Sequence, residues 1–178
     1  MIKEAIRVME KFMSYSRFGI YLYCRPYKKI VENEIRLVDI KDTDVVFLIG
    51  SGAIPFTAIW IMRLSEARVI CVDSDLKAVK RSRKVLKKLR LDEKITVKHH
   101  DGRTDLDILY SVCIIALQVS PLAEVIDQVR FDQSRVIVRL PKVSYAKHYD
   151  VLPNSVKIRE VIGQEMKAFD RSAWIEKV

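Results

Sequence analysis

The stretch Val45–Met62 reads VVFLIGSGAIPFTAIWIM and decides the fold of this chain. It carries no charge, so hydropathy alone would suggest a membrane span. However, Gly50, Gly52 and Pro55 lie in its middle, where a spanning helix would lose backbone hydrogen bonds. A strand, a tight turn and the first turn of a helix use such residues well. No second apolar run follows and charges flank it closely, so we predict a strand–turn–helix unit rather than a membrane protein.

The same alternation continues after this unit. We predict strands over residues 45–49, 68–72, 94–99, 112–117 and 135–140, and helices over residues 56–64, 76–89 and 122–129. Uninterrupted apolar strands such as VVFLI and VCIIAL are typical of a parallel sheet covered on both faces. The segments 156–162 and 166–175 alternate in polarity around a short break, which predicts an antiparallel pair at the sheet edge. The predicted class is α/β, a Rossmann-like, mostly parallel sheet.

The chain has 178 residues, of which 49% are hydrophobic, and this suits one domain with a full core. Helical spacing of apolar residues over 2–13, and again over about 30–37, predicts an N-terminal helical cap in residues 1–40. The three cysteines, Cys24, Cys71 and Cys113, show no metal-binding spacing and indicate a reducing compartment. The N-terminus lacks a secretory h-region, so we expect a cytoplasmic protein.

The turn after the first strand has the chemistry of a cofactor site. In doubly wound sheets, ligands bind at the carboxyl ends of the strands, against turn N–H groups and a helix N-terminus. A dinucleotide fingerprint wants a third glycine at the position of Pro55, which weakens an NAD interpretation. Asp73 ends the next strand, where a carboxylate binds ribose hydroxyls. It could equally be a turn residue, and Ser74 or Asp75 could cap the following helix.

A second carboxylate, Asp101, follows the third strand in the sequence HHDG and could accept from an adenine amine. Gly50-Ser51-Gly52, then Asp73, then Asp101-Gly102, followed by an antiparallel C-terminal pair, resembles the class I S-adenosylmethionine (SAM)-dependent methyltransferase superfamily. Within it, FLIGSGAIPFTAI is most similar to nicotianamine synthase-like proteins, which have an apolar residue where most methyltransferases have an acid. Here that residue is Leu48, and Ile54 replaces the third glycine.

The resemblance implies SAM as cofactor and a set of binding residues. The backbone of Gly50 to Ala53 would hold its amino-acid end, Asp73 its ribose and Asp101 its adenine, with the fourth strand end lining the pocket. The full set comprises Gly50, Ser51, Gly52, Ala53, Asp73, Ser74, Asp101, Gly102, Ala116 and Leu117.

Catalytic residues stay unknown. The segment Leu117–Pro121 does not match the Asn- or Asp-Pro-Pro-aromatic turn of amino-methyltransferases. Methyl transfer needs mainly a positioned nucleophile, so a missing base does not exclude activity. The nicotianamine synthase resemblance points instead to four residues that would hold or deprotonate an amine, and aromatic packing or a solvated helix face explains them equally well. They are Tyr23, Tyr27, Glu32 and Glu34.

Two other features concern metals and partners. His99 and His100 are neighbours on a strand and point to opposite faces, so we predict no metal site. The formal net charge is +9, and the helix over 77–90 carries many basic residues. This indicates either a solvated helix face or an RNA-binding surface. The sequence leaves a homo-oligomer possible.

Three functions remain open. The first is a SAM-dependent methyltransferase with an unknown acceptor. The second is an aminocarboxypropyl transferase of the nicotianamine synthase type, which would release methylthioadenosine rather than S-adenosylhomocysteine. The third is a SAM- or RNA-binding module without turnover.

Overall fold

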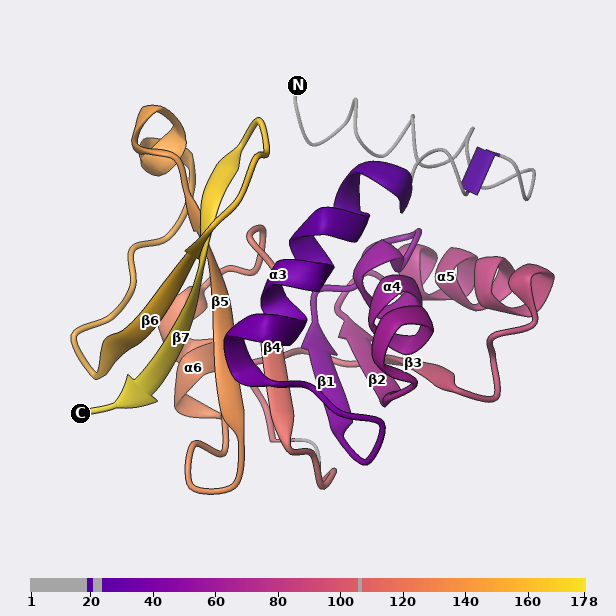
Figure 1. Cartoon of the computed structure of the whole chain (residues 1–178). Coiled ribbons are helices and arrows are strands. Elements are labelled where there is room, and N and C mark those ends of the chain that lie inside the picture. Colours follow the sequence, from indigo (N-terminus) through magenta and orange to yellow (C-terminus); the bar gives the residue numbers. More distant parts are fainter. Residues whose placement is uncertain (1–18, 21–23, 106) are drawn as a thin grey trace.

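A computed structural model describes residues 19–20, 24–105 and 107–178 of the chain, and Figure 1 shows its arrangement. Seven strands form one sheet in the order β3-β2-β1-β4-β5-β7-β6. The first five strands in this order run parallel, and they are β1 (Val45–Ile49), β2 (Arg68–Asp73), β3 (Ile95–His99), β4 (Val112–Ile115) and β5 (Arg135–Pro141). β7 (Phe169–Lys177) runs antiparallel to both β5 and the edge strand β6 (Val156–Gly163). The predicted Rossmann-like sheet is confirmed.

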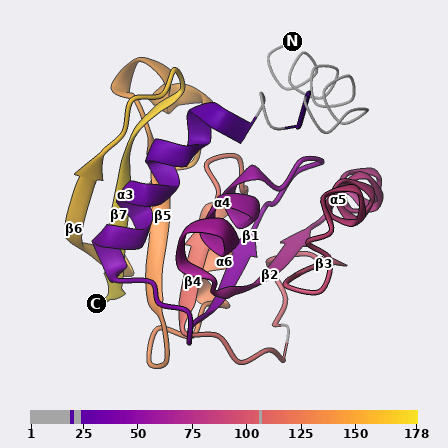
Figure 2. The same cartoon turned by 45° about the vertical axis from the view of Figure 1, so that its right-hand side comes forward.

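Helices cover both faces of this sheet. On one face lie α3 (Lys28–Val38), α4 (Phe56–Ser65) and α5 (Leu76–Leu89), and on the other lies α6 (Leu122–Asp127), as Figure 2 also shows. Side chains in the strands alternate between two cores. In β1, Leu48 belongs to the core under α3, α4 and α5, whereas Phe47 belongs to the core under α6. This is why the central strands β1 and β4 are apolar at every position.

Two short 3-10 helices complete the described elements: η1 (Arg25–Tyr27) before α3, and η2 (Val143–His148) after β5. The expected helix over residues 2–13 lies outside the described residues. Of the two helices predicted within residues 1–40, only the second is described, as α3. Cys24, Cys71 and Cys113 are all buried free thiols, and burial raises the pKa of Cys24 to about 12. Within the described part of the chain, no helix has the length and apolarity that a membrane crossing requires.

Most element boundaries fall within about one residue of the predicted ones. Larger differences occur in β4, in β7 and in α6, which ends at Asp127 rather than residue 129. β4 ends at Ile115 rather than residue 117, because the N–H of Val119 turns back to the carbonyl of Ala116. β7 begins at Phe169 rather than residue 166. The N–H of Gln164 donates to the carbonyl of Asp170, and this closes the hairpin before those residues join the ladder.

Candidate cofactor site

The turn after β1 is held in place by the end of β2. The N–H groups of Gly50 and Ser51 both donate to the carbonyl oxygen of Val72, at 2.9 and 3.2 Å. The N–H of Gly52 donates to Oδ2 of Asp73 at 2.8 Å. Gly50 and Gly52 adopt φ values of 84° and 69°, which side chains other than glycine strongly disfavour. The glycines therefore serve a specific backbone path that brings the turn onto Asp73.

Pro55 was expected in the first turn of the helix, and the structure corrects this by one residue. Pro55 is the N-cap of α4, with φ −81° and ψ 62°, and the N–H of Phe56 donates to the carbonyl of Ile54. This is an inverse γ-turn, which redirects the chain over three residues. It lets α4 begin directly after the glycine turn.

Asp73 links two turns with one carboxylate. Its Oδ2 accepts from Gly52, and its Oδ1 accepts from the N–H of Asp75 at 2.9 Å. Asp75, not Ser74, caps α5, because its side chain accepts from the N–H of Lys77. A carboxylate has about four acceptor positions, so Asp73 keeps room for two hydroxyl donors. The structural and the ribose-binding roles of Asp73 are therefore compatible.

The turn also contains a buried polar atom without a partner. Ser51 is 6% exposed, and its Oγ makes no hydrogen bond within the described structure. A buried hydroxyl left unpaired is unfavourable and is uncommon in folded proteins. The Ala53 N–H, next along the turn, is also without a partner among the described residues. Together these groups fit the amino-acid end of SAM, which carries both donors and acceptors.

Ala116 and Leu117 follow β4 and reach the same edge. A Cβ atom built on Gly50 would lie 3.2 Å from Cβ of Ala116 and 2.8 Å from Cγ2 of Val119, so the loop after β4 packs directly on the glycine turn. Ala116 and Leu117 line a hollow of about 10 Å³ between the ends of β4 and β5. That volume suits roughly one water molecule. The hollow as it stands does not hold a nucleoside.

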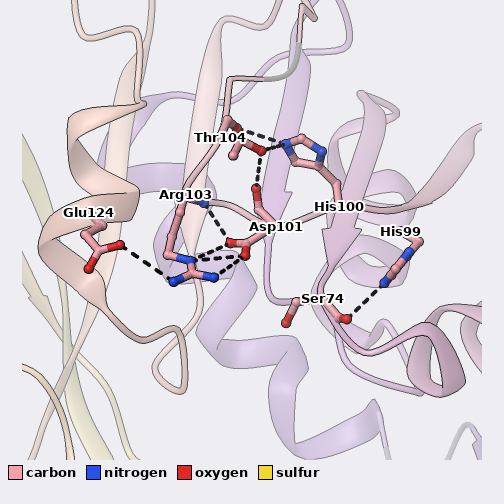
Figure 3. A network of polar contacts seen from close by, with 7 residues as sticks. All are labelled: Ser74, His99, His100, Asp101, Arg103, Thr104 and Glu124. Atoms are coloured by element: carbon pink, nitrogen blue, oxygen red, sulfur yellow. Dashed lines mark hydrogen bonds and ion pairs between the residues drawn. The ribbon is translucent and has the colours of Figure 1, made fainter.

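The loop after β3 leaves the side chain of Asp101 41% exposed, and Figure 3 shows its contact with Arg103. Nε of Arg103 donates to Oδ1 of Asp101 and Nη2 donates to Oδ2, and the guanidinium also approaches Glu124, at 3.8 Å. The side-chain hydrogen bonds from Arg103 lower the pKa of Asp101 to about 2. An ionised carboxylate accepts hydrogen bonds only, which is compatible with an adenine amine as donor.

Gly102 has a packing role. A Cβ atom there would lie 2.9 Å from Cγ2 of Ile49 and would also press on Val125 of α6. Glycine thus lets the β3 loop lie against the end of β1. Gly102 also lines a second hollow of about 10 Å³, on the α6 face of the sheet.

The two histidines make separate contacts. The Nε2 of His99 lies 3.0 Å from the carbonyl oxygen of Ser74, whereas the Nε2 of His100 lies 2.9 Å from that of Thr104 (Figure 3). Each ring is therefore bound to a different turn. A search of the described residues finds no group of three or more metal-binding side chains.

The residues suggested for amine binding lie in or beside α3 and take other roles. Tyr23 is outside the described residues. Tyr27 stacks on Phe56, the first residue of α4, with ring centroids 3.6 Å apart. Glu32 pairs with Lys28 one helical turn away, at 3.5 Å. Glu34 is fully buried in an ion pair with Arg139 of β5, so it is not accessible to an amine in this structure.

The sequence alone did not predict this buried ion pair. Nε of Arg139 donates to Oε1 of Glu34 at 2.7 Å, and Nη2 donates to Oε2 at 2.8 Å and to the Thr57 hydroxyl at 2.9 Å. Burial lowers the pKa of Arg139, but the charge and hydrogen bonds of Glu34 outweigh it and the net pKa is raised. Thr57 lies in the first turn of α4, so the pair joins α3 and β5 to the start of α4.

Further hydrogen bonds extend the pair toward the C-terminal hairpin. The Ser172 hydroxyl donates to Glu34 at 2.8 Å, and Gln164 donates to Ser172 at 3.0 Å. Asn33 then donates to the Gln164 side chain at 3.0 Å. A signal was present in the sequence: Glu34 interrupts the apolar stripe of its helix, and Arg139 interrupts an apolar strand. Charges at such positions are normally paired.

Comparisons with known proteins identify proteins of similar fold. No protein-family model matches the chain. A single-residue mutant of MtNAS, a nicotianamine synthase, has been solved in complex with S-adenosylmethionine. It superposes on this chain with a TM-score of 0.82 and 20% identity, over 95% of this chain and 70% of MtNAS. MtNAS in complex with MTA and tNA gives a TM-score of 0.81 at 19% identity, over 96% of this chain and 69% of MtNAS.

Two further proteins are similar. An RNA methyltransferase from Salinibacter ruber, in complex with S-adenosyl-L-homocysteine, has a TM-score of 0.63 and 17% identity, over 84% of this chain and 90% of its own. An L-histidine 2-aminobutanoyltransferase from Yersinia pestis is 30% identical over 73 residues, which are 41% of this chain and 28% of that enzyme. The match thus spans little more than a quarter of the Yersinia protein. The chain has the Rossmann-like fold of SAM-dependent methyltransferases and nicotianamine synthase.

Proposed function

We propose that this chain binds SAM at the carboxyl ends of β1, β2 and β3 and transfers a carbon group from it to an acceptor. The observation that carries the proposal is the braced glycine turn. Asp73 fixes this turn while keeping free acceptor positions, and the turn leaves the buried Ser51 hydroxyl unpaired. SAM would supply a sulfonium, which makes the carbons attached to it reactive toward a nucleophile. Similar structures that contain SAM or S-adenosyl-L-homocysteine support the same proposal.

Aminocarboxypropyl transfer is the reaction that the comparisons support best. MtNAS matches 95% of this chain with a TM-score of 0.82, whereas the Salinibacter methyltransferase matches 84% with a TM-score of 0.63. The Yersinia enzyme is named for the transfer of an aminobutanoyl group. Methyl transfer is the second candidate, supported by the similarity to the RNA methyltransferase. Buried free cysteines and a basic composition suit a cytoplasmic protein of either kind.

Binding and turnover are tested separately. Calorimetric titration with SAM, S-adenosylhomocysteine and NAD should show heat of binding for the first two ligands and none for NAD. Incubation of the chain with SAM and a set of amines, including histidine, is then followed by mass spectrometry. Methylthioadenosine as product would support aminocarboxypropyl transfer, and S-adenosylhomocysteine would support methyl transfer. Failure of both sulfur compounds to bind at millimolar concentration would contradict the proposed site.

A substitution at Asp73 tests the site itself. Asp73→Asn keeps the size of the side chain but removes charge and acceptor positions, so SAM affinity should fall by roughly 1–3 kcal/mol, or about 5- to 150-fold. Asp75→Asn is the matched control, because asparagine caps a helix about as well as aspartate. Circular dichroism checks that both variants fold. Equal affinity of the two variants for SAM would remove Asp73 from the site.

A further inference from the structure

Helix α5 carries a dense basic surface that the proposed function does not use. Its sequence, LKAVKRSRKVLKKL, contains no acidic residue. Its apolar residues face the sheet, and Val79, Val85 and Leu86 are buried. Every basic side chain of the helix except Arg81 is exposed, and Arg81 is partly exposed; these residues, here called the α5 basic face, are Lys77, Lys80, Arg81, Arg83, Lys84, Lys87 and Lys88.

Most of the basic face forms no ion pair with another described residue. This holds for six of its side chains: Lys77, Lys80, Arg81, Arg83, Lys84 and Lys87. Arg83 has a structural use, because its Nε donates to the carbonyl of Val97 in the edge strand β3 at 2.9 Å. By contrast, helix α3 pairs its Lys28 with Glu32. The charge on these six side chains of α5 therefore stays available to an external anion.

Helix stability explains the charges of the last turn, Lys87 and Lys88, but not those earlier in α5. Lys77–Arg81, Lys80–Lys84 and Lys84–Lys88 are like-charged pairs spaced i, i+4, and such pairs destabilise a helix. Lys77 and Lys80 also lie in the first half of α5, near the positive end of the helix dipole, where cations are unfavourable. The sequence thus retains positive charge against the local preference of the helix, which favours a role in binding.

We propose that the α5 basic face binds the phosphate backbone of RNA. The 14 residues of α5 form a rod of about 21 Å, long enough to follow roughly six phosphates of one strand. Apart from Leu76, which is 44% exposed, the helix offers no exposed apolar side chain. A membrane-binding helix needs a wide apolar face, and a protein interface usually has aromatic or apolar anchors. Phosphate binding needs charge alone.

The position of α5 connects this surface with the candidate site. The helix begins at Leu76, three residues after Asp73, and extends along the β3 end of the sheet, away from the β6–β7 hairpin (Figures 1 and 2). RNA lying along α5 would therefore have one end beside the carboxyl ends of β2 and β3. The inference does not depend on the proposed transfer reaction.

The experiment measures fluorescence anisotropy of a labelled 20-nucleotide RNA with the whole chain at 50, 100 and 200 mM salt. The first variant replaces four residues of the basic face with glutamine, which preserves helix propensity: Lys80, Arg81, Lys84 and Lys87. The matched control removes four charges from the opposite end of the molecule, at Lys147, Lys157, Lys167 and Lys177, all of which are exposed. Both variants have the same net charge.

We expect the α5 variant to bind RNA at least tenfold more weakly at 50 mM salt. Its slope of log K against log salt should lose about 0.7 for each phosphate contact removed. The control variant should stay within about twofold of the unmodified chain. Equal weakening in both variants would overturn the proposal, because net charge would then suffice. Equally strong, α5-dependent binding to polyglutamate or to vesicles containing phosphatidylserine would overturn it in favour of another partner.

Discussion

Two arginine–carboxylate pairs in this molecule have the same chemistry and opposite surroundings. Arg139 and Glu34 lie between β5 and α3 with side chains 4% and 0% exposed, whereas Arg103 and Asp101 lie in the loop after β3 with side chains 49% and 41% exposed. Both arginines donate to both oxygens of their partner. In water such a pair contributes little to stability, whereas in the core each charge depends on its partner. The buried pair should hold the fold and the surface pair should not.

Breaking the buried pair should have the largest effect. Arg139→Met leaves the Glu34 carboxylate buried without a cation, and should lower the free energy of unfolding by about 3–5 kcal/mol. Urea denaturation followed by circular dichroism measures this. A loss below about 1 kcal/mol would show that water reaches Glu34 and that the pair does not hold the fold.

Replacing both partners separates the value of the pair from the cost of breaking it. The double variant Glu34→Leu with Arg139→Met removes both charges, so it should recover at least about 2 kcal/mol relative to Arg139→Met alone. Recovery should be incomplete, because the Thr57 and Ser172 hydroxyls lose partners. Urea denaturation of the two single variants and of the double variant gives the coupling free energy between the two side chains. Additive losses from the two single substitutions would contradict a direct interaction.

A third ion pair, between Asp44 and Arg135, is intermediate in burial, and Asp44 directly precedes β1. Its carboxylate accepts from the Ser111 hydroxyl at 2.6 Å and from Arg135 at 2.5 Å, with side chains 10% and 29% exposed for Asp44 and Arg135. Burial raises the pKa of Asp44, but the hydrogen bonds from Ser111, the Lys41 N–H and Arg135 together lower it. Asp44→Asn should therefore cost about 1–3 kcal/mol at pH 7.

The pH dependence of Asp44 has a definite sign. A folded pKa below the unfolded value of about 3.9 gives stability that is present above pH 4 and is lost as the pH falls through the folded pKa. The difference in stability between the unmodified chain and Asp44→Asn should therefore shrink below pH 4. Melting curves between pH 3 and 7 measure it. A constant difference would mean that the Asp44 charge does not contribute.

Substitution in the surface pair should have the smallest effect on stability. Arg103→Gln should change Tm by less than about 2 °C, because solvent screens the Asp101–Arg103 pair. Asp101→Asn tests the predicted adenine contact: it should leave Tm equally unchanged but weaken SAM binding. Differential scanning fluorimetry with and without SAM gives both readings. A large fall in Tm for Arg103→Gln would remove the contrast between the two pairs.

The sequence predicted the part of the molecule that depends on local pattern. The strand at 45–49 and the helix at 76–89 fall at the predicted residues, because apolar runs, the glycine turn and a capping aspartate define them locally. The position of Asp73 beside the glycine turn also follows from the sequence, because the carboxyl ends of neighbouring parallel strands lie at the same edge of the sheet.

What the sequence did not predict depends on distant partners. Glu34 was a candidate for holding an amine, but it is paired with Arg139, 105 residues further along the chain. No local pattern identifies such a partner. The hydrogen bonds of the Gly50 and Ser51 N–H groups to Val72 were also unforeseen, because backbone donors in a turn look free until the neighbouring strand is placed. The methyl or aminocarboxypropyl acceptor depends on chemistry that no described residue displays.

The long separation within the Glu34 network has a consequence during protein synthesis. Arg139, Gln164 and Ser172 leave the ribosome well after α3, and Glu34 contacts Arg139 and Ser172 across 105 and 138 residues. Until these residues have been synthesised, the Glu34 carboxylate has no cation to pair with, so it stays hydrated and α3 does not pack onto the sheet. Contacts closed over such lengths slow folding. The cap should therefore dock last, after β5 and the β6–β7 hairpin have been made, and nascent chains stopped before residue 139 should leave α3 sensitive to protease.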